Sequence, residues 1–134
     1  MRILLDTNIL VRSVAGRSFS SVIFDALFNQ KFTLCVSTEI LLEYEEILAR
    51  IYDKETAELV ISSMLLLPNV VRVEVYYNMR LISADADDDK FVDCAFASNA
   101  HFIVTDDKHF KVLKNVAFPK IRTLKYADFL EILE

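Results

Sequence analysis

Four acidic side chains stand where parallel strands of a sheet would bring carboxylates together. Asp6 directly follows the apolar run Ile3–Leu5, and Asp107 follows another short apolar run near the C-terminus. Glu43 falls in an amphipathic segment after a further run, and Asp93 lies in the segment leading toward Asp107. Ligand sites in open α/β sheets form beyond the carboxyl ends of the strands. We therefore expect Asp6, Glu43 and Asp107 to converge, joined by Asp93 if its helix packs over that edge.

Carboxylates held close together repel one another and raise one another's pKa unless a cation lies between them. Mg²⁺ and Mn²⁺ prefer oxygen ligands and retain several waters. Such an ion polarises a phosphoryl oxygen and generates a hydroxide near neutral pH, which is the chemistry of phosphodiester hydrolysis. Each acid also has a structural alternative. Asp6, Asp107 and the run Asp87–Asp89 can begin helices, while Glu43 and Asp93 can lie on solvated helix faces.

Short apolar runs and helical periodicity predict the elements that position these acids. The expected strands are Ile3–Leu5, Phe32–Val36, Val70–Val75, Phe102–Thr105 and Ile121–Leu124. The expected helices are Thr7–Ser13, Ser20–Asn29 capped by Ser18 or Ser20, a helix to Ile51 capped by Ser37 or Thr38, Lys54–Leu67 capped by Asp53, Asp89–Asn99, Lys108–Leu113 and Tyr126–Leu133. The periodicity also places Ile51 and Leu59 among the buried residues. Alternating strands and helices predict an α/β fold with three layers, α/β/α, around a parallel sheet.

Composition limits the class of protein. A length of 134 residues with 54% hydrophobic residues predicts one compact domain over residues 1–134. No apolar run approaches the roughly 20 residues that span a bilayer, and no signal peptide begins the chain, so we expect a cytoplasmic protein without a membrane partner. Cys35 and Cys94 lie in separate apolar segments, which predicts buried free thiols rather than a zinc site or a disulfide.

Charge and glycine content exclude several functions. A formal charge of −5 argues against a simple nucleic-acid-binding module, but not against an enzyme whose carboxylates hold cations. Gly16 is the only glycine, which excludes a P-loop and a GxGxxG dinucleotide turn. A phosphatase with Asp6 as its nucleophile usually needs a second aspartate two positions later, where this chain has Asn8.

Four stretches in this order resemble the PIN-domain family: LLDTNIL at the start, Glu43 in mid-chain, DDDKFVDCAFA, and IVTDDKHF. The third stretch is similar to the subgroup of VapC-like toxin components of toxin–antitoxin systems. The resemblance implies a sheet of strand order 3-2-1-4-5 and a Mg²⁺- or Mn²⁺-dependent endoribonuclease with four catalytic acids. Carried over by position, these acids are Asp6, Glu43, Asp93 and Asp107.

The resemblance also implies roles for neighbouring residues. Asp6, Asp93 and Asp107 would hold the metal, and Asp88 matches an acid that recurs in the subgroup. The supporting polar residues would be Thr7, Asn8 and Thr105. Positions near the acids, rather than the resemblance, make Arg12, Lys90 and Lys108, together with Arg17 and His109, candidate contacts to the RNA backbone, although the simpler interpretation of each is a solvated surface charge.

The resemblance further implies an RNA substrate, a cognate antitoxin protein and a homodimer. Two alternatives stay open from the sequence alone. One is a non-catalytic PIN-like scaffold that binds a protein partner, which the presence of an acid at all four positions disfavours. The other is an RNA-processing nuclease without a toxin role, which would use the same site.

Overall fold

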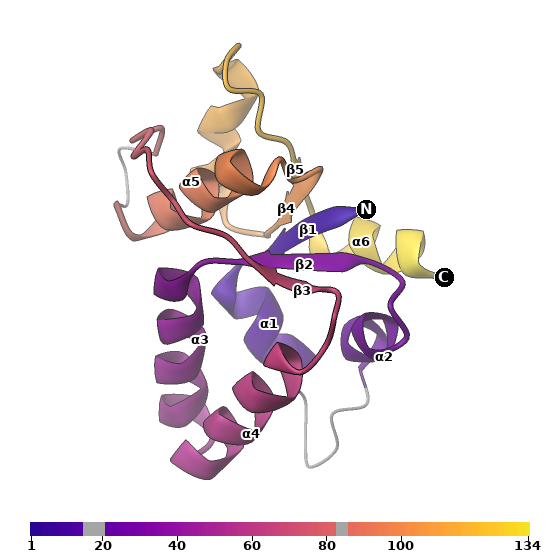
Figure 1. Cartoon of the computed structure of the whole chain (residues 1–134). Helices are drawn as coiled ribbons and strands as arrows, with labels where there is room; N and C mark the ends of the chain where they lie inside the picture. Colours follow the sequence, from indigo (N-terminus) through magenta and orange to yellow (C-terminus); the bar gives the residue numbers. More distant parts are fainter. Residues whose placement is uncertain (15–20, 83–85) are drawn as a thin grey trace.

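The fold is built on one parallel sheet of five strands, in the order β3-β2-β1-β4-β5 (Figure 1). The computed structural model describes residues 1–14, 21–82 and 86–134. The strands are β1 (Arg2–Leu5), β2 (Thr33–Val36), β3 (Val70–Arg72), β4 (Phe102–Val104) and β5 (Thr123–Leu124). Every paired strand runs parallel to its neighbour. The predicted fold class and strand order are therefore confirmed, with β1 at the centre.

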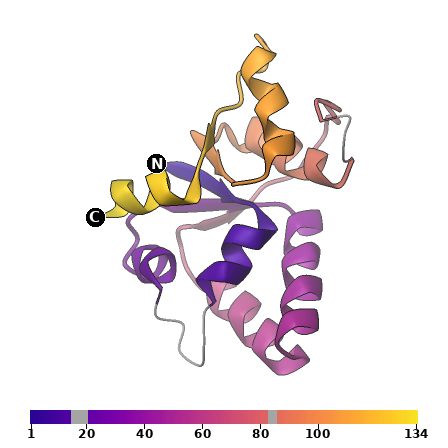
Figure 2. The same cartoon turned by 180° about the vertical axis from the view of Figure 1, so that it is seen from behind.

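Helices cover both faces of this sheet. They are α1 (Thr7–Ser13), α2 (Val22–Phe28), α3 (Thr38–Ile51), α4 (Lys54–Leu65), α5 (Asp89–Ser98) and α6 (Tyr126–Leu133), with 3₁₀ helices η1 (Ala86–Asp88) and η2 (Lys108–Asn115). Figures 1 and 2 show α1, α2, α3 and α4 on one side of the sheet and α5 with η2 on the other. Contacts of α5 with β1, β2 and β4 place it directly over the central strands.

Side-chain caps set the beginnings of three helices. Ser21, Ser37 and Asp53 accept hydrogen bonds from the backbone N–H groups three residues later, at the starts of α2, α3 and α4. Ser37 and Asp53 cap the helices as the sequence predicts. The predicted caps Ser18 and Ser20 lie outside the described residues.

The third strand is shorter than predicted and ends at Arg72 rather than Val75. The last ladder bond runs from the Val73 N–H to the Val36 carbonyl, over 2.8 Å. Val36 ends β2, and β3 is the edge strand, so the chain beyond Val73 has no neighbouring strand with which to pair. The segment that follows is left to connect β3 with η1.

The core lies on both faces of β1, whose residues Ile3, Leu4 and Leu5 are fully buried. A strand covered on both faces reads as an unbroken apolar run, which explains why the sequence identified it. The predicted burial of Ile51 and Leu59 is wrong, because each side chain is 55% exposed. Ile51 is the last residue of α3, and α4 buries a neighbouring face that includes Val60 and Met64.

Two further sequence predictions concern cysteines and membranes. Cys35 and Cys94 are buried free thiols, as predicted. Within the described part of the chain, no helix combines the length and apolar character needed to cross a bilayer.

Candidate active site

Asp6 stands at the carboxyl end of β1, on the edge of the sheet where β4 also ends. Its backbone N–H donates to the Val104 carbonyl over 3.0 Å, and its side chain is only 6% exposed. The Thr105 hydroxyl donates to Asp6 Oδ2 over 2.7 Å. Burial raises the pKa of Asp6, and the nearby charges of Asp107 and Glu43 raise it further, against the lowering effect of Thr105. The charges of Asp107 and Glu43 thus act on the buried carboxyl group of Asp6, which is the effect expected of three acids that lie near one another.

Thr105 links Asp6 to the next acid along the chain. Its hydroxyl oxygen accepts the Asp107 backbone N–H over 3.0 Å while its proton points to Asp6. Asp107 Oδ1 in turn accepts the His109 N–H over 2.9 Å and so caps η2. The capping alternative for Asp107 is therefore real, and it coexists with a position beside Asp6. One buried hydroxyl thus connects the Asp6 carboxylate to the backbone of Asp107.

Glu43 reaches the same edge from α3, and protein donors occupy both of its oxygens. The Thr7 hydroxyl donates to Oε2, and Lys90 Nζ lies 2.7 Å from Oε1. Lys90 Nζ also donates to the Asp87 carbonyl over 2.7 Å, and its side chain is 14% exposed. Lys90 thus balances the charge of Glu43 and ties α3 to the start of α5.

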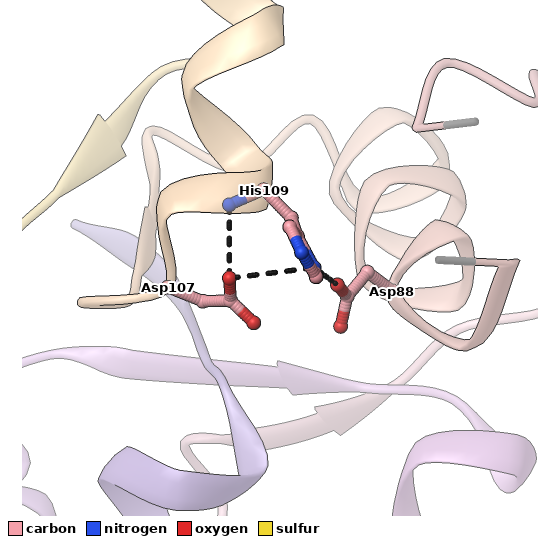
Figure 3. Close-up of side chains that lie close together, drawn as sticks. All are labelled: Asp88, Asp107 and His109. Atoms are coloured by element: carbon pink, nitrogen blue, oxygen red, sulfur yellow. Dashed lines mark hydrogen bonds and ion pairs between the residues drawn. The ribbon is translucent and has the colours of Figure 1, made fainter. Parts of the chain in front are cut away.

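Asp88, Asp107 and His109 form a group of potential metal ligands in the part of the chain that the structure describes (Figure 3). One ligand atom from each lies within 4.8 Å of the others. His109 Nδ1 is 3.4 Å from Asp88 Oδ2 and 3.5 Å from Asp107 Oδ1. Two carboxylates and an imidazole are a donor set that suits Mn²⁺, and carboxylates with waters suit Mg²⁺. The residues present therefore fit a divalent cation.

Asp93 is buried in different surroundings. Its side chain is 5% exposed, and Oδ1 accepts the Met79 backbone N–H over 2.8 Å. Burial raises its pKa, the Met79 N–H lowers it, and the charges of Asp89 and Glu39 raise it further. The acids that act on Asp6 are a different pair. Asp93 lines a hollow of about 240 Å³ beside Lys90, whereas the group of potential metal ligands that contains Asp107 also contains Asp88 and His109.

The remaining residues that the sequence predicts for the site differ in their contacts. Arg12 extends from α1 to Asp106, with 3.3 Å between guanidinium and carboxylate, and its guanidinium lies 4.7 Å from the centre of the Tyr126 ring. Asn8 and Lys108 have exposed side chains. Arg17 lies outside the described residues. Sequence reasoning missed the contact of His109 with Asp88, because only the fold brings η1 and η2 together.

Comparison with known proteins shows which family and which solved structures this architecture resembles. A family model described as PIN domain matches residues 2–109. No curated protein matches this chain.

Three similar solved structures share the architecture along nearly their whole length. VapBC2 from Rickettsia felis, bound to a DNA fragment from its promoter, is 20% identical, with a TM-score of 0.63 over 93% of this chain and 98% of that one. VapBC-1 from nontypeable Haemophilus influenzae is 16% identical, with a TM-score of 0.61 over 95% and 99%. Mycobacterium tuberculosis VapC20, described as a Sarcin-Ricin loop cleaving toxin, is 13% identical, with a TM-score of 0.58 over 90% and 98%. At these identities the likeness concerns the fold.

Proposed function

From the premise that this chain belongs to the PIN domain family, we propose that it is a metal-dependent endoribonuclease acting at the carboxyl end of its sheet. One observation carries the proposal. The buried Asp6 is held by Thr105 while the charges of Asp107 and Glu43 raise its pKa. A fold that only needed stability would not gather these charges, because like charges at one site are destabilising. A divalent cation resolves the repulsion and supplies hydrolytic chemistry.

Asp88, Asp107 and His109, together with Asp6 beside Asp107, would hold Mg²⁺ or Mn²⁺, which when bound supplies a Lewis acid and lowers the pKa of its water. The chain's own residues set the geometry. Thr105 holds the Asp6 carboxylate by donating its hydroxyl proton, and it holds the Asp107 backbone by accepting the Asp107 N–H. Thr7 and Lys90 hold the carboxylate of Glu43 in place near Asp6. Protein donors already engage both carboxylate oxygens of Glu43. We therefore propose that Glu43 would interact with the cation through a water molecule rather than directly.

The third acid has two candidates, and the choice between them is testable. The sequence resemblance assigns Asp93, whereas the contact through His109 favours Asp88. If Asp88 holds the cation, Asp88→Asn lowers cleavage by at least about 100-fold, and Asp93→Asn has a much smaller effect. The reverse order would assign the role to Asp93. Both variants replace a buried carboxylate by an isosteric amide, so each controls for the other.

The biological role that we propose is the toxin of a toxin–antitoxin pair. The support is the likeness in fold to structures titled VapBC and VapC. An antitoxin that covers the site and a second copy of the chain are the partners expected on this basis. If the role is correct, induced expression in bacteria arrests growth for the wild type but not for Asp6→Asn. Cleavage in vitro without growth arrest would favour the RNA-processing alternative.

Cleavage of labelled single-stranded RNA by purified protein tests the enzymatic proposal. The comparison includes Mn²⁺, EDTA and Asp6→Asn, with Asp25→Asn on the exposed face of α2 as the matched control. We expect cleavage that requires the cation, disappears in Asp6→Asn and persists in Asp25→Asn. Equal cleavage by the wild type and Asp6→Asn would contradict the proposal and move the protein-binding scaffold to the front.

A further inference from the structure

The basic residues of this acidic chain are unevenly distributed. Residues 108–125 contain six of the 15 Lys and Arg residues and none of the 20 Asp and Glu residues. A block of one charge sign in a chain of opposite net charge is typical of a surface that contacts a polyanion. The block begins directly after Asp107, one of the acids of the candidate site. Its position along the chain therefore connects it to the proposed chemistry.

The fold gathers part of this block around one hollow. Lys111 and Lys114 extend from η2, and Lys125 precedes α6; together they line a hollow of about 190 Å³. Thr105 and Asp107 line the same hollow. Figure 2 shows η2, in orange, on the face of the sheet that α5 covers, with the chain returning from it toward α6, in yellow. The lysine-lined hollow thus shares a wall with the acidic site.

Asp106, Asp107 and Asp128 also line the hollow, but none of them forms an ion pair with its lysines in the described part of the chain. Asp106 pairs with Arg12 over 3.3 Å and accepts the Tyr126 backbone N–H over 3.0 Å. Asp107 Oδ1 is engaged by His109. Within the described part of the chain, none of the hollow's three lysines forms an ion pair, and all three are exposed. Their ammonium groups are available to phosphate oxygens, which lysine binds as a point charge.

We infer that the lysine-lined hollow binds backbone phosphates of the RNA strand beside the scissile bond, through Lys111, Lys114 and Lys125. This inference rests on the proposed function, because it identifies the strand that the site cleaves. Contacts to phosphates position a nucleic acid without reading its sequence. An acidic segment of a partner protein has the same charge, but the wall shared with Thr105 and Asp107 favours the substrate.

The test measures binding of fluorescent single-stranded RNA in EDTA, where the proposed cleavage is off. The first variant carries Lys111→Gln, Lys114→Gln and Lys125→Gln. The control carries Lys31→Gln, Arg50→Gln and Lys54→Gln, three exposed residues elsewhere that lower the net charge equally. Each contact with a single strand contributes about 0.7 to the slope of log affinity against log salt. We expect the first variant to lose a slope of about 2 and affinity on the order of 100-fold at 0.1 M salt.

The control variant should keep its affinity within about twofold, because charges farther away than the screening length contribute little. Equal affinities for the hollow variant and the wild type would overturn the inference. It would also be overturned if the hollow variant bound RNA normally but no longer bound a polyglutamate peptide, which would assign the hollow to a protein partner. Circular dichroism confirms that each variant is folded. Because binding is measured without a cation, a failure of the nuclease proposal in the cleavage assay is distinguishable from a failure here.

Discussion

Replacing Asp6 by asparagine should stabilise the fold while it abolishes cleavage. The amide oxygen of asparagine can still accept the Thr105 hydroxyl, which donates to the carboxylate over 2.7 Å. The substitution removes a buried negative charge that lies in the fields of Asp107 and Glu43. Removing this charge repulsion should raise the free energy of unfolding by on the order of 1 kcal/mol, as is typical when a destabilised functional site is neutralised. For a chain of this length, that is about 3–5 °C in Tm.

The pH dependence of this difference has a definite sign. The folded-state pKa of Asp6 is raised above its ordinary value of 3.8, so its contribution to stability is greatest below 3.8 and is lost as pH rises through the raised value. Asparagine does not titrate. The stability advantage of Asp6→Asn in EDTA is therefore expected to be largest at neutral pH and to shrink as the pH falls through the folded-state pKa.

Metal binding should reverse the order of stability. Saturating Mn²⁺ at 100 times its Kd adds about 2.7 kcal/mol to a protein that binds it only when folded. The wild type is expected to gain this increment, and Asp6→Asn to lose most of it. Thermal melts give the Tm of the wild type and of Asp6→Asn, each in EDTA and in Mn²⁺. Asp25→Asn is the control. A variant that is less stable than the wild type in EDTA, or gains equally from Mn²⁺, would refute the reasoning.

Three further predictions follow from single contacts. Thr105→Val leaves buried polar partners without their hydroxyl, which costs about 1–3 kcal/mol in chemical denaturation and lowers cleavage, whereas Thr33→Val on β2 should cost less; equal losses would contradict this role. Tyr44→Phe removes a buried phenol that donates to the last carbonyl of β1, and should cost about 1 kcal/mol; an unchanged midpoint would argue against the bond. Burial raises the pKa of Cys94 to about 12, so we expect no maleimide labelling of this thiol at pH 8 before unfolding, and rapid native labelling would contradict its burial.

Much of the fold was accessible from sequence because its central strands are buried on both faces. The run Ile3–Leu5 has no polar interruption, and side chains such as Ser37 and Asp53 mark helix starts by a local rule. The length of β3 was not accessible, because it depends on where the partner strand β2 ends. The exposure of Leu59 was not accessible either, since it depends on which face of α4 packs against α3.

The candidate site, like the fold, could be predicted from the sequence only in part. Asp6 directly follows β1 and Asp107 is the third residue after β4, so the topology of a parallel sheet brings them to one edge. Asp88 ends the 3₁₀ helix η1, whereas Asp93 lies inside α5, five residues further along the chain. Choosing between them requires the orientation of α5, which the sequence does not contain. The ion pair of Lys90 with Glu43 joins segments far apart in the chain and likewise needs the fold.

The most direct test of the central claim is a Mn²⁺ titration in which bound metal and RNA cleavage are recorded in the same samples. Electron paramagnetic resonance measures the bound ion, and a labelled single-stranded RNA reports cleavage. We expect cleavage by the wild type to rise in step with occupancy, and both signals to be lost in Asp107→Asn. Cleavage that continues in Asp107→Asn, or metal occupancy in the wild type without any cleavage of varied RNAs, would contradict the assignment of this acidic edge as a metal-dependent nuclease centre.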